Sequence, residues 1–213
     1  MAKNYQLTHI LAQNKPYTTV YAAFNVNKNE LFTAKISDLE SLDDSQSILA
    51  EVSRTKHIRH ANILSLIECF VDDSQIWCIY PFMYYGSCKD ILDCVNSLNL
   101  SEEDKLFANL QNASSVDRAD EQKRLCFNEQ SLQPITKSIL SALDYLHSKH
   151  IIHRCVCPEN IFISQSGQVY LSGFKYSVSL IDQGQLVKRL HDYPSNLSDY
   201  LNYLSPEFLQ QVI

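Results

Sequence analysis

The sequence predicts an α+β fold in two lobes, a small β-rich lobe with one main helix over residues 5–85 and a mainly helical lobe over residues 86–213. Runs rich in β-branched and aromatic residues dominate the first 82 residues, which is typical of short strands. A helical repeat of apolar residues marks the second half. Residues 96–126 are polar and charged, which predicts a flexible insertion within the second lobe.

Composition excludes several classes of protein. The chain has 213 residues, of which 45% are hydrophobic and 20% charged, so it is globular and can bury a sizeable core. Its longest dense apolar run, Ile76–Tyr85, is too short to cross a bilayer, and no secretory signal is visible. The net charge of −6 without a basic run argues against nucleic acid. Seven scattered cysteines suit reduced thiols. We therefore expect a protein of the cytoplasm or nucleus with no membrane and no nucleic-acid partner.

The first lobe begins with strand-like runs. Thr19–Val26 and Glu30–Ser37 are joined by three polar residues and are predicted to form a hairpin. A helix follows, with Ser41 as its N-cap and acidic residues in its first turn, where the helix dipole favours them. Two further strands are predicted at Ile63–Val71 and Gln75–Phe82.

Gly86 opens the helical half, with a short helix predicted over residues 87–98. The clearest helix carries apolar residues at spacings of 3, 4, 4 and 3, namely Leu132, Ile135, Ile139, Leu143 and Leu146. Pro134 is expected in its first turn, where a missing N–H costs nothing. Residues 160–164 and 168–173 flank a predicted hairpin turn. The remainder, Phe174–Ile213, is tyrosine-rich and is expected to be mostly irregular.

Six short motifs follow one another along the chain. "FTAK" ends at Lys35, and Glu51 lies in the next helix, nine residues before "HANIL". "IYPFMYYGSCKDIL" comes next, followed by "HRCVCPEN" over His153–Asn160. "LSGFK" and "LSPE" complete the series. The order and spacing of these motifs resemble a eukaryotic protein kinase domain, and the resemblance implies a bilobal protein kinase-like fold.

The resemblance implies roles for individual residues. Lys35 matches the lysine that pairs with nucleotide phosphates, and Glu51 matches its helix partner, although the two could instead be an exposed ion pair of little energetic weight. Asn160 matches a metal-binding asparagine, although it could instead cap local backbone. Tyr80 takes the gatekeeper position. The residues predicted to bind nucleotide are Val20, Thr33, Lys35, Glu51, Tyr80, Pro81, Met83 and Asn160.

The departures from the kinase pattern are equally informative. No glycine precedes residue 86, so the glycine-rich loop expected before Val20 is missing. Cys155 replaces the catalytic aspartate, Cys157 the loop lysine and Gly173 the D-F-G aspartate. Loss of a general base costs roughly 10²–10⁴ in rate, and a thiol is a poor substitute. Loss of the metal clamp removes further charge stabilisation. We therefore expect a catalytically impaired pseudokinase with no catalytic residues and no bound metal.

Within the kinases, four segments resemble the Sterile-20-related adaptor (STRAD) pseudokinases: "FMYYGSCKDIL", "LDYLHSKHIIHR", "GQVYLSGFKYSVSLIDQGQ" and "HDYPSNLSDYLNYLSPEFLQQ". The resemblance covers nearly the whole chain except residues 96–126. It implies an adaptor that binds ATP without needing magnesium and adopts a closed, active-like shape. It further implies activation of a liver kinase B-type Ser/Thr kinase together with a calcium-binding-protein-39-type scaffold.

The end of the chain raises two expectations. A kinase large lobe continues well past the A-P-E motif, whereas this chain stops at Ile213, six residues after Glu207, so we expect a partial, truncated C-terminal lobe. The tyrosines of the final segment, Tyr193, Tyr200 and Tyr203, are expected either in the core or facing a partner, where aromatic residues are good anchors.

Two other functions remain open. The chain could be an atypical active Ser/Thr kinase that recruits Asp182, Asp192 or Asp199, or a fragment without independent function. A metal site is disfavoured, because the spacing of the candidate ligands matches no usual zinc pattern; these are His147, His150, His153, Cys155 and Cys157. Cys155 and Cys157 could instead be a reactive pair, although no cationic cluster lies nearby in sequence.

Overall fold

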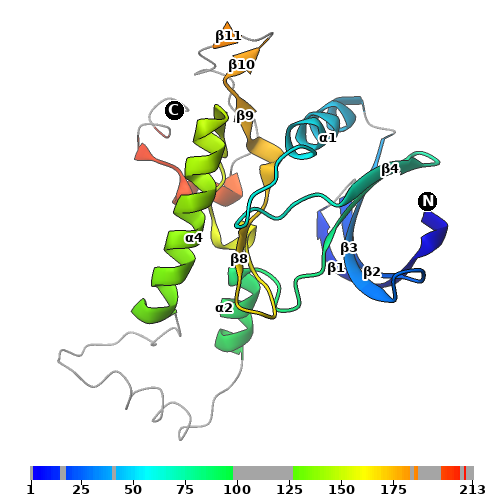
Figure 1. The fold of residues 1–213 in the computed structure, drawn as a ribbon, viewed down its shortest axis with the longest axis horizontal. Coiled ribbons are helices and arrows are strands. Elements are labelled where there is room, and N and C mark those ends of the chain that lie inside the picture. Colours follow the sequence, from blue (N-terminus) through cyan, green and yellow to red (C-terminus); the bar gives the residue numbers. More distant parts are fainter. Residues whose placement is uncertain are drawn as a thin grey trace, which may run out of the picture.

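The computed structural model describes residues 2–14, 18–39, 42–97, 127–182, 185–186, 198–206 and 209. Figure 1 shows a curved sheet with one adjacent helix, α1, and a second part that contains α2 and α4. The predicted α+β class and its two-part layout are confirmed. Most of the predicted insertion, residues 98–126, lies outside the described residues. Of the helices that are described, none is both long and apolar enough to cross a membrane.

A five-stranded antiparallel sheet with the order β1-β2-β3-β5-β4 forms the first part. Its strands are β1 (Tyr5–Asn14), β2 (Thr18–Asn25), β3 (Glu30–Asp38), β4 (Glu68–Asp72) and β5 (Gln75–Pro81). The predicted hairpin of β2 and β3 is confirmed. Strand β1 was not predicted from the sequence. It lies at the edge of the sheet, where only Tyr5 is buried, so it lacks the apolar alternation of a half-buried strand.

The two faces of this sheet have different roles, because successive side chains point to opposite faces. One face carries an apolar core of Tyr5, Ala23, Phe32, Ala34, Ile36, Trp77 and Ile79. The other faces α1 (Leu42–Thr55), where Ile48 packs with Cys78 and Tyr80. Lys35 shares this second face, since it pairs in register with Cys78. The sheet therefore presents Lys35 toward α1, which lies on the side of the helical half (Figure 1).

The prediction of a strand over Ile63–Val71 is wrong in its first half, because β4 begins only at Glu68. The preceding residues connect the two parts of the molecule instead. Leu64 donates its backbone N–H to the Leu171 carbonyl (2.9 Å), and Leu171 donates to the Asn62 carbonyl (2.8 Å). Ile63, Leu64 and Leu66 are buried, Ile63 in the cluster that contains Leu171 and Leu66 in the cluster that contains Ile48 and Cys78. The run is apolar because it lies between two packed parts, which the sequence does not distinguish from strand pairing.

Two helices of the second part have side-chain caps. In α2 (Cys88–Ser97), the Asp90 carboxylate accepts from the Ser87 backbone N–H at 2.8 Å. In α4 (Glu129–Ser148), the Asn128 side chain accepts from the Ser131 N–H at 2.8 Å. Pro134 is therefore the sixth residue of α4, and its placement in the first turn was wrong. In the second turn its missing N–H removes an intrahelical bond.

The second hydrophobic core lies between α4 and the hairpin of β7 (Ile161–Ile163) and β8 (Val169–Leu171), which confirms the predicted hairpin. Ile139 and Leu146 of α4 are buried there, whereas Leu132 is 45% exposed, so only part of the predicted apolar face is covered. The remaining short elements are η1 (Ala2–Asn4), β6 (Ile151–Ile152), η2 (Pro158–Asn160), η3 (Phe174–Tyr176), β9 (Val178–Ser179), β10 (Ile181–Asp182), β11 (Gln185–Leu186) and η4 (Ser198–Tyr203).

Candidate functional site

An ion pair between β3 and α1 forms the centre of the site. The Lys35 Nζ lies 2.9 Å from Glu51 Oε2 and 3.0 Å from Oε1. The Glu51 side chain is only 9% exposed and the Lys35 side chain 26%. The pair is therefore largely shielded from water, unlike the exposed pair considered as the alternative. The predicted contact is confirmed, and it holds α1 against the sheet.

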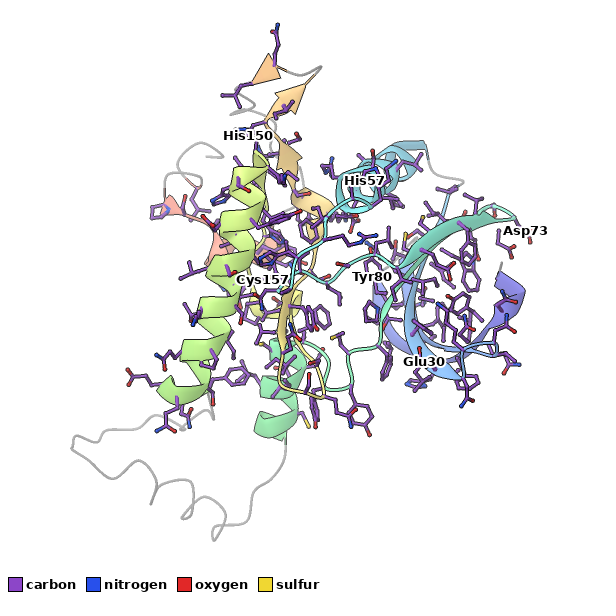
Figure 2. All side chains as sticks on the ribbon, in the orientation of Figure 1. Glu30, His57, Asp73, Tyr80, His150 and Cys157 are labelled. Carbon is purple, nitrogen blue, oxygen red and sulfur yellow. The ribbon has the colours of Figure 1, made fainter. Side chains whose placement is uncertain are left out.

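Other predicted nucleotide-binding residues lie around this pair. Val20 pairs in register with Lys35, and Thr33 pairs with Tyr80, so alternation places all four on the face toward α1. Tyr80 lies on the side of the sheet facing the helical half (Figure 2). Burial, followed by the charge of Glu51, raises the pKa of Tyr80 well above its usual value. Contact of these residues with a nucleotide stays a prediction.

The segment after Tyr80 carries the other two predicted adenine contacts. Pro81 ends β5, and the Met83 carbonyl accepts the Gly86 N–H at 3.1 Å in the following turn. Both side chains are half-buried. Their position at the end of β5 follows directly on that of Tyr80, but nothing in the described contacts tests a role in nucleotide binding.

His153 fixes the loop that follows β6. Its Nε2 lies 2.9 Å from the Ser172 carbonyl oxygen, and its Nδ1 accepts the Cys155 backbone N–H at 3.3 Å. A neutral ring protonated on Nε2 satisfies both contacts. The ring also packs edge-on against Phe174, with centroids 4.8 Å apart. Burial lowers the pKa of His153 to about 4. The ring is therefore neutral and holds the loop in place through these contacts.

The two cysteines that replace the kinase aspartate and lysine point toward one another. Their sulfurs are 3.9 Å apart, and both residues are buried. Asn160 Nδ2 donates to the Cys155 carbonyl (2.9 Å) and lies 3.3 Å from the Cys155 sulfur and 3.2 Å from the Cys157 sulfur. The Asn160 amide thus holds the loop locally, as the alternative interpretation anticipated. Contact of Asn160 with a ligand stays a prediction.

These contacts shift the pKa values of the two thiols in opposite directions. The pKa of Cys155 is lowered by its contact with the Cys157 thiol and, to a smaller extent, by the hydrogen bond from the Asn160 amide. The pKa of Cys157 is raised by the same contact with Cys155 and by burial. Figure 2 shows Cys157 in the helical half. In the described residues, no group of three or more His, Cys, Asp or Glu side chains is placed to hold a metal ion.

Gly173, at the position of the D-F-G aspartate, packs directly on Asn160. Its φ of +82° lies in the left-handed region, and a Cβ atom there would lie 2.1 Å from Asn160 Cγ and Oδ1. An aspartate at residue 173 would therefore collide with the Asn160 side chain. An acid at residue 173 would require the Asn160 side chain to move from this position.

The residues after Gly173 tie the loop to α1. Phe174 is buried in the second core. The Ser177 hydroxyl donates to the Phe174 carbonyl at 2.7 Å and accepts from Arg54 Nε of α1 at 3.2 Å. Lys175, at the position of the D-F-G glycine, is exposed and lies over the Tyr176 ring. The helix that carries Glu51 is thus fastened both to the sheet and to η3.

The candidate partner-facing tyrosines differ in their surroundings. Tyr200 is half-buried, its ring lies 5.9 Å from that of Tyr176, and burial raises its pKa to about 12. Tyr203 is 47% exposed. Tyr193 and the alternative acid Asp192 lie outside the described residues, whereas Asp182 lies in β10 and Asp199 in η4. Partner contact stays a prediction for all three tyrosines.

Two features of the site region were not predicted from the sequence. Glu159 of the loop lies 3.7 Å from Lys89, which connects η2 to α2. Cys69 and Cys78 face each other across β4 and β5, with sulfurs 3.6 Å apart. The second pair could have been found, because the two cysteines lie equally far from the turn at Asp73 and Ser74.

The protein kinase domain family matches residues 16–212, which is nearly the whole chain. The chain therefore belongs to the protein kinase domain family. Within it, the chain is 32% identical over 161 residues to STE20-related kinase adapter protein alpha of Gallus gallus, covering 76% of this chain and 34% of that protein.

Two further relatives agree. STE20-related kinase adapter protein alpha of Homo sapiens is 29% identical over 210 residues, which are 97% of this chain and 42% of the relative. STE20-related kinase adapter protein strd-1 of Caenorhabditis elegans is 33% identical over 175 residues, 82% of this chain and 37% of the relative. The predicted relationship to these adapters is confirmed. The chain spans between about a third and two fifths of the length of these three relatives.

Proposed function

We propose that this chain is a pseudokinase adaptor that binds ATP without magnesium and, in a closed shape, activates a partner Ser/Thr kinase of the liver kinase B type. A calcium-binding-protein-39-type scaffold joins this complex, in the cytoplasm or nucleus. One observation carries the proposal: the Lys35–Glu51 pair is formed, while the acids expected at residues 155 and 173 are replaced by cysteine and glycine. The shape of a phosphate site is kept without the groups that perform transfer.

The nucleotide would lie between the sheet face and the catalytic-loop side. Lys35, oriented by Glu51, is the group that would pair with phosphate oxygens. Val20 and Thr33 share its face, and Tyr80, Pro81 and Met83 would line the adenine end. Strand register places all of these residues except Glu51, which lies in α1, and Met83, which lies in the turn after β5.

Magnesium does not fit the groups at the loop. Magnesium prefers carboxylate oxygens, and residue 173 offers none. Asn160 can offer only its amide oxygen, because its amide nitrogen, which is not a metal ligand, is directed at the Cys155 carbonyl and the two sulfurs. Without a metal, the charge of the phosphates would be balanced by Lys35, and no phosphoryl transfer follows from these groups.

Activation of a partner is supported by the relatives, whose names describe them as kinase adapters. A closed shape is supported by the double attachment of α1, to β3 through Glu51 and to Ser177 through Arg54. A pseudokinase held in this way offers a partner one defined surface rather than an ensemble. Tyr203, which is 47% exposed, is the described aromatic residue of the final segment that such a partner would meet.

Reconstitution tests the proposal. The purified chain is added to a liver kinase B-type kinase and the scaffold protein, and phosphorylation of a peptide substrate is measured. We expect a several-fold increase that requires the partner's own catalytic aspartate, and no transfer by the chain alone. Tyr203→Ala should weaken activation, whereas Tyr85→Ala is the matched control, because Tyr85 is 51% exposed against 47% for Tyr203 but lies outside the final segment.

Two results would contradict the proposal. Transfer by the chain alone that is lost in Lys35→Met would make the chain an atypical kinase. A folded chain that neither binds the partner nor raises its activity would exclude the adaptor function.

A further inference from the structure

Two cysteines lie opposite one another in the sheet beside the site. Cys69 of β4 and Cys78 of β5 are direct antiparallel partners, so their side chains share one face. Their sulfurs are 3.6 Å apart, and no disulfide joins the described cysteines. Direct partners have Cα atoms about 4.5–5.5 Å apart, which is within the range of about 4.4–6.8 Å that a disulfide requires. A bond between them therefore needs little movement of the backbone.

The two thiols are not equivalent. Cys69 is half-buried, whereas Cys78 is 4% exposed and packs with Ile48 and Leu66 beneath α1. The contact with the Cys78 thiol lowers the pKa of Cys69. The same contact and burial raise the pKa of Cys78. A small oxidant can therefore reach Cys69, the thiol with more thiolate character, while the Cys78 thiol is in position to react with it next.

We propose that Cys69 and Cys78 are a peroxide-sensitive dithiol that closes into a reversible disulfide across β4 and β5. The Cys69 thiolate attacks hydrogen peroxide: an S–O bond forms, the O–O bond breaks, and hydroxide leaves. The Cys78 sulfur then attacks Cys69, forming the S–S bond and breaking the S–O bond. The Cys78 proton and the departing oxygen leave as water. In sum, two thiols and one peroxide give one disulfide and two waters, and a dithiol reductant reverses the change.

The position of the pair places this chemistry next to the ion pair. Cys78 is the register partner of Lys35, and Cys78 contributes to the apolar cluster that seats α1. A disulfide at this point would fix β4 to the strand that adjoins Lys35. The proposal stands on the sheet geometry alone and is independent of nucleotide or partner binding.

The other close pair provides an internal comparison. The Cys155 and Cys157 sulfurs are farther apart, at 3.9 Å, and both residues are at most 3% exposed. Neither member is open to an oxidant in solution. We expect this pair to react more slowly than Cys69 and Cys78.

The test uses the full chain treated with graded hydrogen peroxide, alkylated with N-ethylmaleimide and digested without reduction. Cleavage at Asp72 and Asp73 separates the two cysteines, and chymotrypsin separates Cys78 from Cys88. We expect peptides containing Cys69 and Cys78 joined by a disulfide that dithiothreitol releases. Dimedone, which traps sulfenic acid, should label Cys69 in Cys78→Ser. Cys94→Ser, which changes an exposed cysteine of α2, should form the disulfide as the unchanged chain does.

Three results would overturn the proposal. Cys69 and Cys78 could both stay reduced, and therefore be alkylated, at peroxide levels that oxidise Cys94. Cys69 could be linked mainly to a different cysteine. The Cys155–Cys157 disulfide could form at lower peroxide than the proposed one. Because the unchanged chain is mapped directly, these outcomes do not depend on whether a serine variant folds.

Discussion

The Asn160 side chain fills the space that any side chain at residue 173 would need. A Cβ atom on Gly173 would lie 2.1 Å from two of its atoms, whereas a Cβ atom on Gly167 would meet nothing within 4 Å. The two glycines share a left-handed backbone, with φ of +82° and +79°. Alanine substitution at both positions therefore separates the free-energy cost of the left-handed backbone from the cost of the collision with Asn160.

We predict that Gly173→Ala lowers the free energy of unfolding by about 3 kcal/mol or more, from left-handed strain plus overpacking. Gly167→Ala should cost only about 1 kcal/mol, from the strain alone. Urea unfolding of both variants measures the difference. Equal costs would show that Asn160 does not occupy the space beside residue 173. The same clash means that Gly173→Asp alone should not create a metal site.

The Lys35–Glu51 pair is shielded enough to matter for stability. Lys35→Met would leave the Glu51 carboxylate, 9% exposed, without its cation, and we predict a loss of about 2 kcal/mol. Lys89→Met is the matched control, because the Lys89 side chain is 48% exposed and its ammonium lies 3.9 Å from Asp93 and 3.7 Å from Glu159, whose side chains are 66% and 33% exposed. Its cost should stay below about 0.5 kcal/mol.

Denaturation at pH 7 measures both changes, and Lys35→Met combined with Glu51→Gln should cost less than the sum of the single changes. Additive costs, or equal costs for Lys35→Met and Lys89→Met, would show that the buried pair contributes no more than a surface pair.

His153 should make stability depend on pH. Its pKa is about 4 in the folded chain, against an ordinary value of 6.5, so the unfolded chain binds more protons between these values. The contribution is fully present above pH 6.5 and is lost as pH falls toward 4, by about 3 kcal/mol in total. His153→Gln should flatten this part of the profile of unfolding free energy against pH, whereas His9→Gln, on exposed β1, should not. An unchanged slope in His153→Gln would contradict the buried neutral ring.

At the scale of elements, α1 is the part that joins the two halves of the site. Its Glu51 binds β3, and its Arg54 donates to Ser177 just after η3. The segment over residues 62–64 provides a second connection through backbone bonds to Leu171. Because α1 is held from both sides, loosening one attachment should be detectable in the helix itself.

We predict that Ser177→Ala increases amide hydrogen exchange along α1 and lowers the free energy of unfolding by about 1 kcal/mol, since the hydrogen bond between Arg54 Nε and the Ser177 hydroxyl is lost. Ser179→Ala is the matched control, because among the described residues the Ser179 hydroxyl bonds only the backbone of nearby Ile181, donating to its carbonyl at 3.1 Å and accepting its N–H at 3.2 Å. Exchange mass spectrometry checks both variants. Unchanged exchange in Ser177→Ala would mean that η3 does not stabilise α1.

Local patterns predicted most of these elements, and the failures have physical causes. The β2–β3 hairpin, α2, α4 and the β7–β8 hairpin follow from periodicity and turn residues. The start of β4 was misplaced because an apolar run buried between lobes reads like a strand. Pro134 was misplaced because the cap, Asn128, lies four residues before the first apolar position of the repeat.

The candidate site was also predicted only in part from the sequence. Motif order predicted the Lys35–Glu51 contact. Local capping was one of the two interpretations of Asn160, and the Cys69–Cys78 pair could have been found from the turn at Asp73 and Ser74. The packing of Gly173 on Asn160 depends on tertiary placement, which no single motif contains.

At the scale of the whole molecule, the chain keeps the kinase features that form the sheet and position Lys35, and it lacks the acids that phosphoryl transfer requires. The sheet register and α1 place Lys35, while the loop that would carry the acid is closed by His153, Asn160 and two thiols. We infer that such a molecule binds nucleotide as a structural ligand. If so, binding should not depend on a divalent cation.

The measurement that tests this claim most directly is the thermal unfolding of the chain with ATP, in excess chelator and in magnesium. We predict that ATP at about 100-fold its dissociation constant raises the midpoint by roughly 5–10 °C in both conditions. The shift should be much smaller in Lys35→Met. A shift that appears only with magnesium, or no shift in a cooperatively folded chain, would contradict a metal-independent nucleotide site.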